Sequence, residues 1–386
     1  MKLFGFAISL GLLCGLLAGR LTFALLPTLP IPNTHPLFAA FGLRRPYVLG
    51  FLPYWLIERA QESYDDKLTS LAYFALTVSP DGSIQKSITA QEQEPGWTAL
   101  TGNSLHRKTR LPTTLVLHNS NEDELLALIK DPIVHADRLV SQVAPILNQY
   151  NIAHLNLDFE SFSQVSEDER TAFTTFIQHV VAGVKNNSGT SVSFDLVPYH
   201  LIKRRLSDPI AIARLVDYVI LMGYDFSYSQ SYLAGPVSPV GGAGRRWDYD
   251  VATALELATQ QIPKEKILLG LALYGYEWQT LSNIPGSAVI PHTAAVASNR
   301  RVESLLAGCT RCTASFDEVA KEPSLTFPKD QLYQQIFYTN EASLGQKLQL
   351  AKQYKLGGVA LWALGYEGKT MLNPLTTFKR DALWLD

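Results

Sequence analysis

Short apolar runs alternate with amphipathic stretches along most of the chain. Eight runs rich in apolar and β-branched residues predict strands: Tyr47–Pro53, Ser70–Leu76, Thr113–His118, Ala153–Phe159, Ser191–Val197, Tyr218–Met222, Ile267–Leu273 and Gly358–Trp362. Amphipathic patterns between them predict helices, most clearly over Ala136–Gln149, Glu167–Lys185, Asp250–Gln260 and Glu341–Tyr354. Eight strands interleaved with helices favour an α/β fold, a (β/α)8 TIM barrel, with an open doubly wound sheet as the alternative.

More than eighty residues separate the seventh predicted strand from the eighth. A helical crossover needs only about a dozen. We therefore predict a small inserted α+β subdomain, approximately residues 276–337, at the mouth of the barrel. It contains Cys309 and Cys312, which could be a metal or redox pair, a loop disulfide or two free thiols. Because no second ligand pair stands nearby, the disulfide or free thiols are favoured, and we predict neither a metal nor a cofactor.

The N-terminal region differs from the rest of the chain. An almost unbroken apolar stretch from Leu3 to Gly19 follows Met1-Lys2. Residues 1–26 are therefore expected to be a signal peptide or an N-terminal membrane anchor, which places the barrel outside the cytoplasm. Residues 27–46 contain five prolines and predict an extended linker. The barrel is expected over residues 47–386.

Overall composition excludes some partners. Hydrophobic residues make up 47% of the chain and charged residues 18%, which is typical of a folded domain. A net charge of −2 without blocks of Lys or Arg does not favour nucleic-acid binding. We expect a monomer whose only contact with a membrane is through the N-terminal segment.

The most informative pattern is the alternation from His154 to Glu160. In a strand, Leu155, Leu157 and Phe159 share one face, while the polar residues His154, Asn156, Asp158 and Glu160 share the other. An antiparallel strand with one wet face would also show such alternation. However, helices are predicted on both sides of this strand, and its two acids fall at the C-terminal end, where barrel enzymes place catalytic groups. The row therefore predicts an active site.

This segment resembles the Asp-x-x-Asp-x-Asp-x-Glu signature of the family 18 glycoside hydrolases, the chitinase group. Asp158 and Glu160 keep the last two acids, while Ala153 and Asn156 stand in place of the first two. The Asn-x-Asp-Phe-Glu form resembles the branch of spore-cortex-lytic N-acetylglucosaminidases and chitinase-domain proteins. Further segments resemble the family in the same order: Tyr47–Trp55, Leu71–Ser83, Leu221–Asp225, Ala234–Pro239, Lys266–Tyr274 and Gly357–Trp362.

The resemblance implies a retaining enzyme in which the 2-acetamido oxygen of the substrate is the nucleophile. Glu160 would then be the general acid and base, with a raised pKa, and Asp158 would orient the acetamide group. Tyr224 would hydrogen-bond the acetamide carbonyl, Asp225 would hold a sugar hydroxyl, and Trp362 would form the floor beneath the reacting sugar.

Other residues are weaker candidates. Asn156, Tyr54 and Trp55 are expected to bind substrate. Trp247, Trp278 and Tyr366 could line further subsites, whereas His154 is expected to be a hydrogen-bonded core residue.

The expected reaction is hydrolysis of β-linked, N-acetylglucosamine-containing glycans, either peptidoglycan-type glycans or chitin oligomers. The cortex-lytic likeness favours the peptidoglycan type. A sugar-binding lectin on the same fold and a scaffold protein without a ligand are the alternatives. The presence of Glu160 argues against the lectin, because lectin relatives of the family usually lack this residue.

Overall fold

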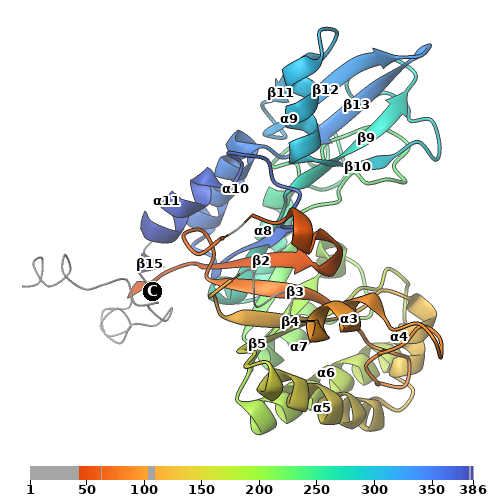
Figure 1. Ribbon diagram of the computed structural model, residues 1–386, viewed down its shortest axis with the longest axis vertical. Coiled ribbons are helices and arrows are strands. Elements are labelled where there is room, and N and C mark those ends of the chain that lie inside the picture. The colour runs from red at the N-terminus through yellow and green to blue at the C-terminus, as the bar shows by residue number, and fades with distance from the viewer. Residues whose placement is uncertain (1–42, 62, 103–108, 382–383, 386) are drawn as a thin grey trace, which may run out of the picture. The chain divides into compact units, whose positions relative to one another are not determined.

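The computed structural model describes residues 43–61, 63–102, 109–381 and 384–385 (Figure 1). Eight parallel strands close into a barrel in the order β14-β2-β3-β4-β5-β6-β7-β8. Their bounds are β2 (Tyr47–Pro53), β3 (Ser70–Thr77), β4 (Thr113–Asn119), β5 (His154–Phe159), β6 (Ser191–Leu196), β7 (Tyr218–Met222), β8 (Ile267–Ala272) and β14 (Gly358–Trp362). The predicted TIM barrel is therefore confirmed, and the open doubly wound sheet is excluded.

Helices connect the barrel strands. They are α3 (Pro95–Thr101), α4 (Glu122–Leu128), α5 (Pro132–Gln149), α6 (Glu167–Ser188), α7 (Pro209–Leu215), α8 (Val251–Gln261) and α10 (Glu341–Tyr354), and a further helix, α11 (Asn373–Asp381), follows β14. A capping box between Ser166 and Glu169 begins α6, and Gly189 in the left-handed conformation ends it. The Asn340 side chain accepts a hydrogen bond from the Ser343 N–H at 2.9 Å, so it caps the N-terminus of α10.

The hydrophobic core has two layers, because both faces of each barrel strand are covered. In the outer layer, apolar strand residues pack against helices, as where Phe159 meets Phe173 and Phe176 of α6. The inner layer fills the barrel with residues that include Val116 and Ile220. Any polar side chain on the inner face therefore needs a partner inside the barrel.

A five-stranded antiparallel sheet with one helix is inserted between β8 and β14, and Figure 1 shows it as a separate layer beyond the barrel strands. Its strand order is β10-β9-β13-β12-β11. Its elements are β9 (Tyr274–Thr280), β10 (Ala295–Ser298), α9 (Asn299–Gly308), β11 (Thr313–Asp317), β12 (Glu322–Lys329) and β13 (Leu332–Tyr338). This confirms the predicted α+β subdomain, which begins two residues earlier and ends one residue later than expected. A disulfide joins Cys309 to Cys312 in the turn between α9 and β11.

A buried ion pair attaches this subdomain to the barrel. Lys347 of α10 lies with its Nζ 2.6 Å from Glu322 Oε1 of β12, and both side chains are fully buried. The other Glu322 oxygen accepts a hydrogen bond from the Ser238 N–H at 3.1 Å. Because removing either charge would leave the other buried and unpaired, the pair fixes the position of β12 against α10.

The predicted N-terminal segment lies largely outside the part of the chain that the structure describes. Residues 1–42, which include the expected leader or anchor and most of the linker, lie outside the described part of the chain. Strand β1 (Leu43–Arg44) pairs with β15 (Trp384–Leu385) in a two-stranded sheet. None of the helices in the described ranges is long and apolar enough to cross a membrane.

Candidate active site

The polar row of β5 faces the interior of the barrel. Asn156 pairs in register with Val116, which belongs to the inner core layer, and Asp158 pairs with His118. Both Asn156 and Asp158 are buried. The Glu160 N–H donates to the Asn119 carbonyl at 3.1 Å, which extends the pairing of β5 with β4 by one residue. The two acids therefore lie at the C-terminal end of a barrel strand, as predicted.

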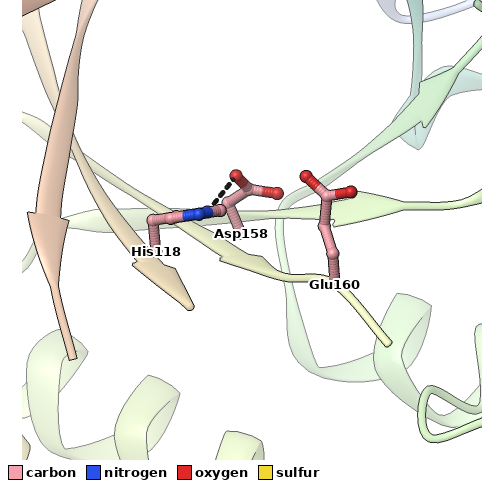
Figure 2. A group of neighbouring side chains, drawn as sticks. All are labelled: His118, Asp158 and Glu160. Carbon is pink, nitrogen blue, oxygen red and sulfur yellow. Dashed lines mark hydrogen bonds and ion pairs between the residues drawn. The ribbon is translucent and has the colours of Figure 1, made fainter. Parts of the chain in front are cut away.

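His118, Asp158 and Glu160 form a compact group, and Figure 2 shows the three side chains beside one another. His118 Nδ1 lies 2.8 Å from Asp158 Oδ2. Burial opposes the charged form of the ring, but the hydrogen bond and charge of Asp158 outweigh it and raise the pKa of His118. Sequence reasoning missed His118, although it ends a predicted barrel strand.

Glu160 can act as a proton donor at neutral pH. Burial of its carboxyl group is the main cause that raises the pKa of Glu160 to about 8, and the charge of Asp158 adds to the rise. The charge of His118 acts in the opposite direction. The carboxyl group therefore carries its proton below about pH 8 and loses it as the pH rises through that value.

Asp195 of β6 is a third acid of this group, and sequence reasoning missed it. Asn156 Nδ2 donates to Asp195 Oδ1 at 2.8 Å and to Ser193 Oγ at 3.0 Å. Burial and the charge of Asp158 raise the pKa of Asp195 well above its usual value. The signal was present in the sequence, because polar and apolar residues alternate along Ser191–Leu196 just as they do along β5.

Tyr224 and Asp225 follow β7 and lie beside this group. Burial, together with the charges of Asp195 and Glu160, raises the pKa of Tyr224 well above its usual value, so its hydroxyl remains a donor. Asp225 has a left-handed backbone with φ 59° and accepts a hydrogen bond from the Tyr274 hydroxyl at 2.6 Å. Desolvation raises the pKa of Asp225 to about 6, against the opposing effect of the hydrogen bonds from Tyr274 and Tyr276.

A chain of aromatic rings connects the acids with the protein surface. The Trp362 ring lies 4.6 Å from that of Phe74, whose ring lies 5.1 Å from His118 and 5.8 Å from Trp55. Tyr54 packs on Trp55 at 4.8 Å, and Trp55 is 48% exposed. The structure thus brings together three aromatic residues that were predicted to bind substrate. Trp55 is the solvent-exposed end of this row of rings.

The remaining candidates lie outside the acid group and its row of aromatic rings. Trp278 is fully buried in the core that β9 and β13 share, so the expectation that it lines a subsite is wrong. Trp247 donates from Nε1 to the Gly241 carbonyl in the loop after β7. The Tyr366 ring packs on that of Tyr274 at 6.0 Å.

His154 is hydrogen-bonded to Ser191 and packs on Tyr47, in agreement with the predicted core role.

His118, Asp158 and Glu160 each offer one atom within 4.8 Å of the others, a spacing at which a cation could bind. His118 Nδ1 and Asp158 Oδ2 already bond to each other. Glu160 carries a proton at neutral pH, whereas a metal ligand must be deprotonated. The arrangement therefore suits proton transfer better than metal binding.

A closed (β/α)8 barrel with a protonated glutamic acid beside a second carboxylate at the end of a strand has the architecture of a glycoside hydrolase. Residues 51–367 match the family model described as glycosyl hydrolases family 18, and the chain belongs to that family.

Known relatives share the fold at low identity. The chain is 25% identical over 313 residues to the cortical fragment-lytic enzyme of Bacillus anthracis, covering 77% of this chain and 65% of that protein. Among solved structures, the spore cortex-lytic enzyme SleL of Bacillus cereus superposes with a TM-score of 0.67 at 22% identity, covering 86% of this chain and 73% of that one. The Group IV chitinase of Ostrinia furnacalis gives 0.70 at 18% identity, covering 87% and 99%.

Replacing Glu160 with Gln keeps the size of the side chain but removes the ionisable proton. Because a general acid commonly contributes about 10²–10⁴-fold, we expect kcat on an N-acetylated oligosaccharide to fall by about that factor, with binding retained. Glu167→Gln, at the exposed start of α6, is the matched control and should leave both unchanged. Activity of Glu160→Gln within a few-fold of wild type would exclude Glu160 as the acid.

Replacing Asn156 with Asp puts a carboxyl group where an amide N–H now bonds to Asp195 Oδ1. We expect the fold to persist and the acid limb of the pH–rate profile to move to higher pH, because an added negative charge makes protons on the buried cluster harder to remove. The profile of kcat/KM against pH measures the shift. An unmoved acid limb would show that position 156 does not couple to Asp158.

Proposed function

We propose that this chain hydrolyses β-linked, N-acetylglucosamine-containing glycans with retention of configuration, using the 2-acetamido group of the substrate as nucleophile. The observation that supports this most is the pair formed by a proton-bearing Glu160 and Asp158 at the end of β5. Membership of family 18 and the likeness to a cortical fragment-lytic enzyme support glycan hydrolysis. The chain spans about 65% of the length of the first such relative, so the activity of that whole protein enters here only as part of the proposal.

In the proposed reaction, Glu160 protonates the leaving glycosidic oxygen while the acetamide oxygen attacks the anomeric carbon. Asp158 is held by the hydrogen bond between its Oδ2 atom and His118. It accepts a hydrogen bond from the acetamide N–H and stabilises the positive charge that forms on the cyclised intermediate. The Tyr224 hydroxyl hydrogen-bonds the acetamide carbonyl. Glu160, now ionised, deprotonates the water that opens the intermediate.

The sugar is held by the surrounding side chains. Asp225 would bind a hydroxyl group, and Trp362 would pack under the pyranose ring, whose C–H groups suit an aromatic face. Tyr54 and Trp55 would continue the aromatic surface towards solvent. Asn156 would act through Asp195 because its amide already bonds to that residue.

An arginine-lined depression favours a glycan that carries negative charge. It has a volume of about 710 Å³, and Arg59, Arg300, Arg301 and Tyr366 are among the residues that line it. Arg301 is paired with Glu277, while Arg300 donates to the Arg59 carbonyl at 2.9 Å. Tyr366 packs on Tyr274, which donates to Asp225, so the depression begins close to the proposed catalytic group. Chitin is uncharged, whereas peptidoglycan carries carboxylates, and we therefore place peptidoglycan-type glycans ahead of chitin.

Such a polymer lies outside the cytoplasm. We accordingly propose that residues 1–26 direct export or anchor the chain, that residues 27–46 form a linker, and that the barrel acts outside the cytoplasm as a monomer.

The substrate-assisted step can be tested with two matched reporter glycosides, one with a 2-acetamido group and one with a 2-hydroxyl group. We expect turnover of the first alone, because only it contains the attacking oxygen, and strong inhibition by a thiazoline mimic of the cyclised intermediate. Equal turnover of both glycosides, or a sugar trapped covalently on Asp158, would contradict the mechanism. Binding of the N-acetylated oligomer without products would instead indicate a lectin. If there were neither binding nor products, the result would indicate a scaffold protein.

The glycan class can be tested by comparing cell-wall sacculi with chitin oligomers at increasing salt concentration. If the arginines bind carboxylates of the glycan, kcat/KM on sacculi should exceed that on oligomers of similar length and should fall as salt screens the charges. The rate on the neutral oligomers serves as the control and should change little. Salt-independent cleavage of sacculi, or a preference for chitin, would refute the preference for a charged glycan.

A further inference from the structure

The two carboxylate oxygens of Asp158 have different surroundings. Its Oδ2 atom bonds to His118, whereas its Oδ1 atom is buried and accepts no hydrogen bond from an N–H or hydroxyl group among the described residues. The carboxyl groups of Glu160 and Asp195 are the acids within hydrogen-bonding reach of Asp158. A buried carboxylate oxygen without a donor destabilises the folded protein, because it has lost its hydrogen bonds to water. A proton on a neighbouring acid would remove this cost.

Asp195 is the neighbouring acid in the right place. The register between β5 and β6 pairs Asn156 with Ser193 and Leu157 with Phe194, and its continuation sets Asp158 opposite Asp195. Neighbouring strands lie about 4.8 Å apart, and side chains two residues apart share a face. The Asp195 carboxyl group therefore faces Asp158 inside the barrel, within hydrogen-bonding reach.

Asn156 determines which oxygen of Asp195 is available. Its amide donates to Asp195 Oδ1 at 2.8 Å, so that oxygen acts as an acceptor. An amide cannot ionise, and it fixes the orientation of the carboxyl group that it contacts. The second Asp195 oxygen is left to carry a proton towards Asp158.

We propose that Asp195 is held as a neutral carboxylic acid that donates its proton to Asp158 Oδ1, and that it is a positioning residue for the hydrolysis proposed above. Asp158 then carries the single negative charge of the pair, held between His118 on one side and Asp195 on the other.

The surroundings of Asp195 support the neutral form. The titratable groups that act on it are Asp158 and Glu160 from the β5 side, while Tyr224 lies on the β7 side. Burial and these two acids disfavour a second negative charge, and they raise the pKa of Asp195. His118 already bonds to Asp158 through its Nδ1 atom.

An Asp195→Asn variant separates a neutral Asp195 from an ionised one. Asparagine reproduces the neutral acid, because its oxygen can accept from Asn156 and its N–H group can donate to Asp158. We expect kcat/KM of Asp195→Asn to stay within about threefold of wild type, with the alkaline limb of its pH profile unmoved. Asp195→Ala removes the donor and should lose about 10- to 100-fold.

An ionised Asp195 would give a different result. Its replacement by Asn would then remove a negative charge beside Glu160 and move the alkaline limb to lower pH. That shift, or a loss for Asp195→Asn as large as that for Asp195→Ala, would overturn the proposal. Asp217→Asn, at the other end of the barrel where Asp217 pairs with Lys185, is the matched control and should leave the profile unchanged.

Infrared spectroscopy of the full chain tests the same proton without a substrate. The difference spectrum of wild type minus Asp195→Asn at neutral pH should contain the carbonyl band of a protonated carboxylic acid, and the corresponding Asp217→Asn spectrum should contain a carboxylate band instead. A carboxylate band for Asp195 would refute the neutral acid. If wild type cleaves no N-acetylated glycan, the proposed function fails, and the infrared result still decides the state of Asp195.

Discussion

A closed parallel barrel buries both faces of every strand, and the chemistry of the site depends on this constraint. Side chains that point inwards can meet only one another, because the interior offers them little water. His118, Asp158 and Asp195 occupy neighbouring positions on β4, β5 and β6 and form one row. Such a row can hold few charges of the same sign. The pKa of each acid in the site therefore depends on the charges of its neighbours, and Glu160 is protonated at neutral pH for this reason as well as because of its burial.

The same constraint explains how well the sequence predicted the fold. Strands buried on both faces form short apolar runs, and all eight were predicted to within one residue at each end. Two of the four members of the cluster were also visible, because Asp158 lies in β5 and Glu160 directly follows that strand. His118 and Asp195 join it only through the register between strands, which local patterns do not encode. Trp278 was misassigned although Tyr274, Tyr276 and Trp278 alternate along β9, a pattern that indicates a shared buried face.

The inserted subdomain contributes to the site through one of its own acids. Glu322 binds Lys347 with one oxygen and the Ser238 N–H with the other. The Ser238 hydroxyl donates at 2.5 Å to the carbonyl of Gly223, the residue before Tyr224. A buried carboxylate of the subdomain thus helps to set the backbone that presents Tyr224.

Closure of the barrel has a consequence for biosynthesis. Strand β14, the last barrel strand to be synthesised, pairs with both β2 and β8. It therefore closes the barrel between the first barrel strand and the seventh. Until β14 emerges, β2 and β8 each have an open edge, and strands with open edges readily pair with other chains. A nascent chain at that stage already contains every acid of the cluster. It still lacks β14, the strand whose pairing closes the barrel and excludes water from the cluster. Translation must therefore reach the codon of Trp362 before the acids of β5 and β6 can acquire the proton affinities of the finished protein.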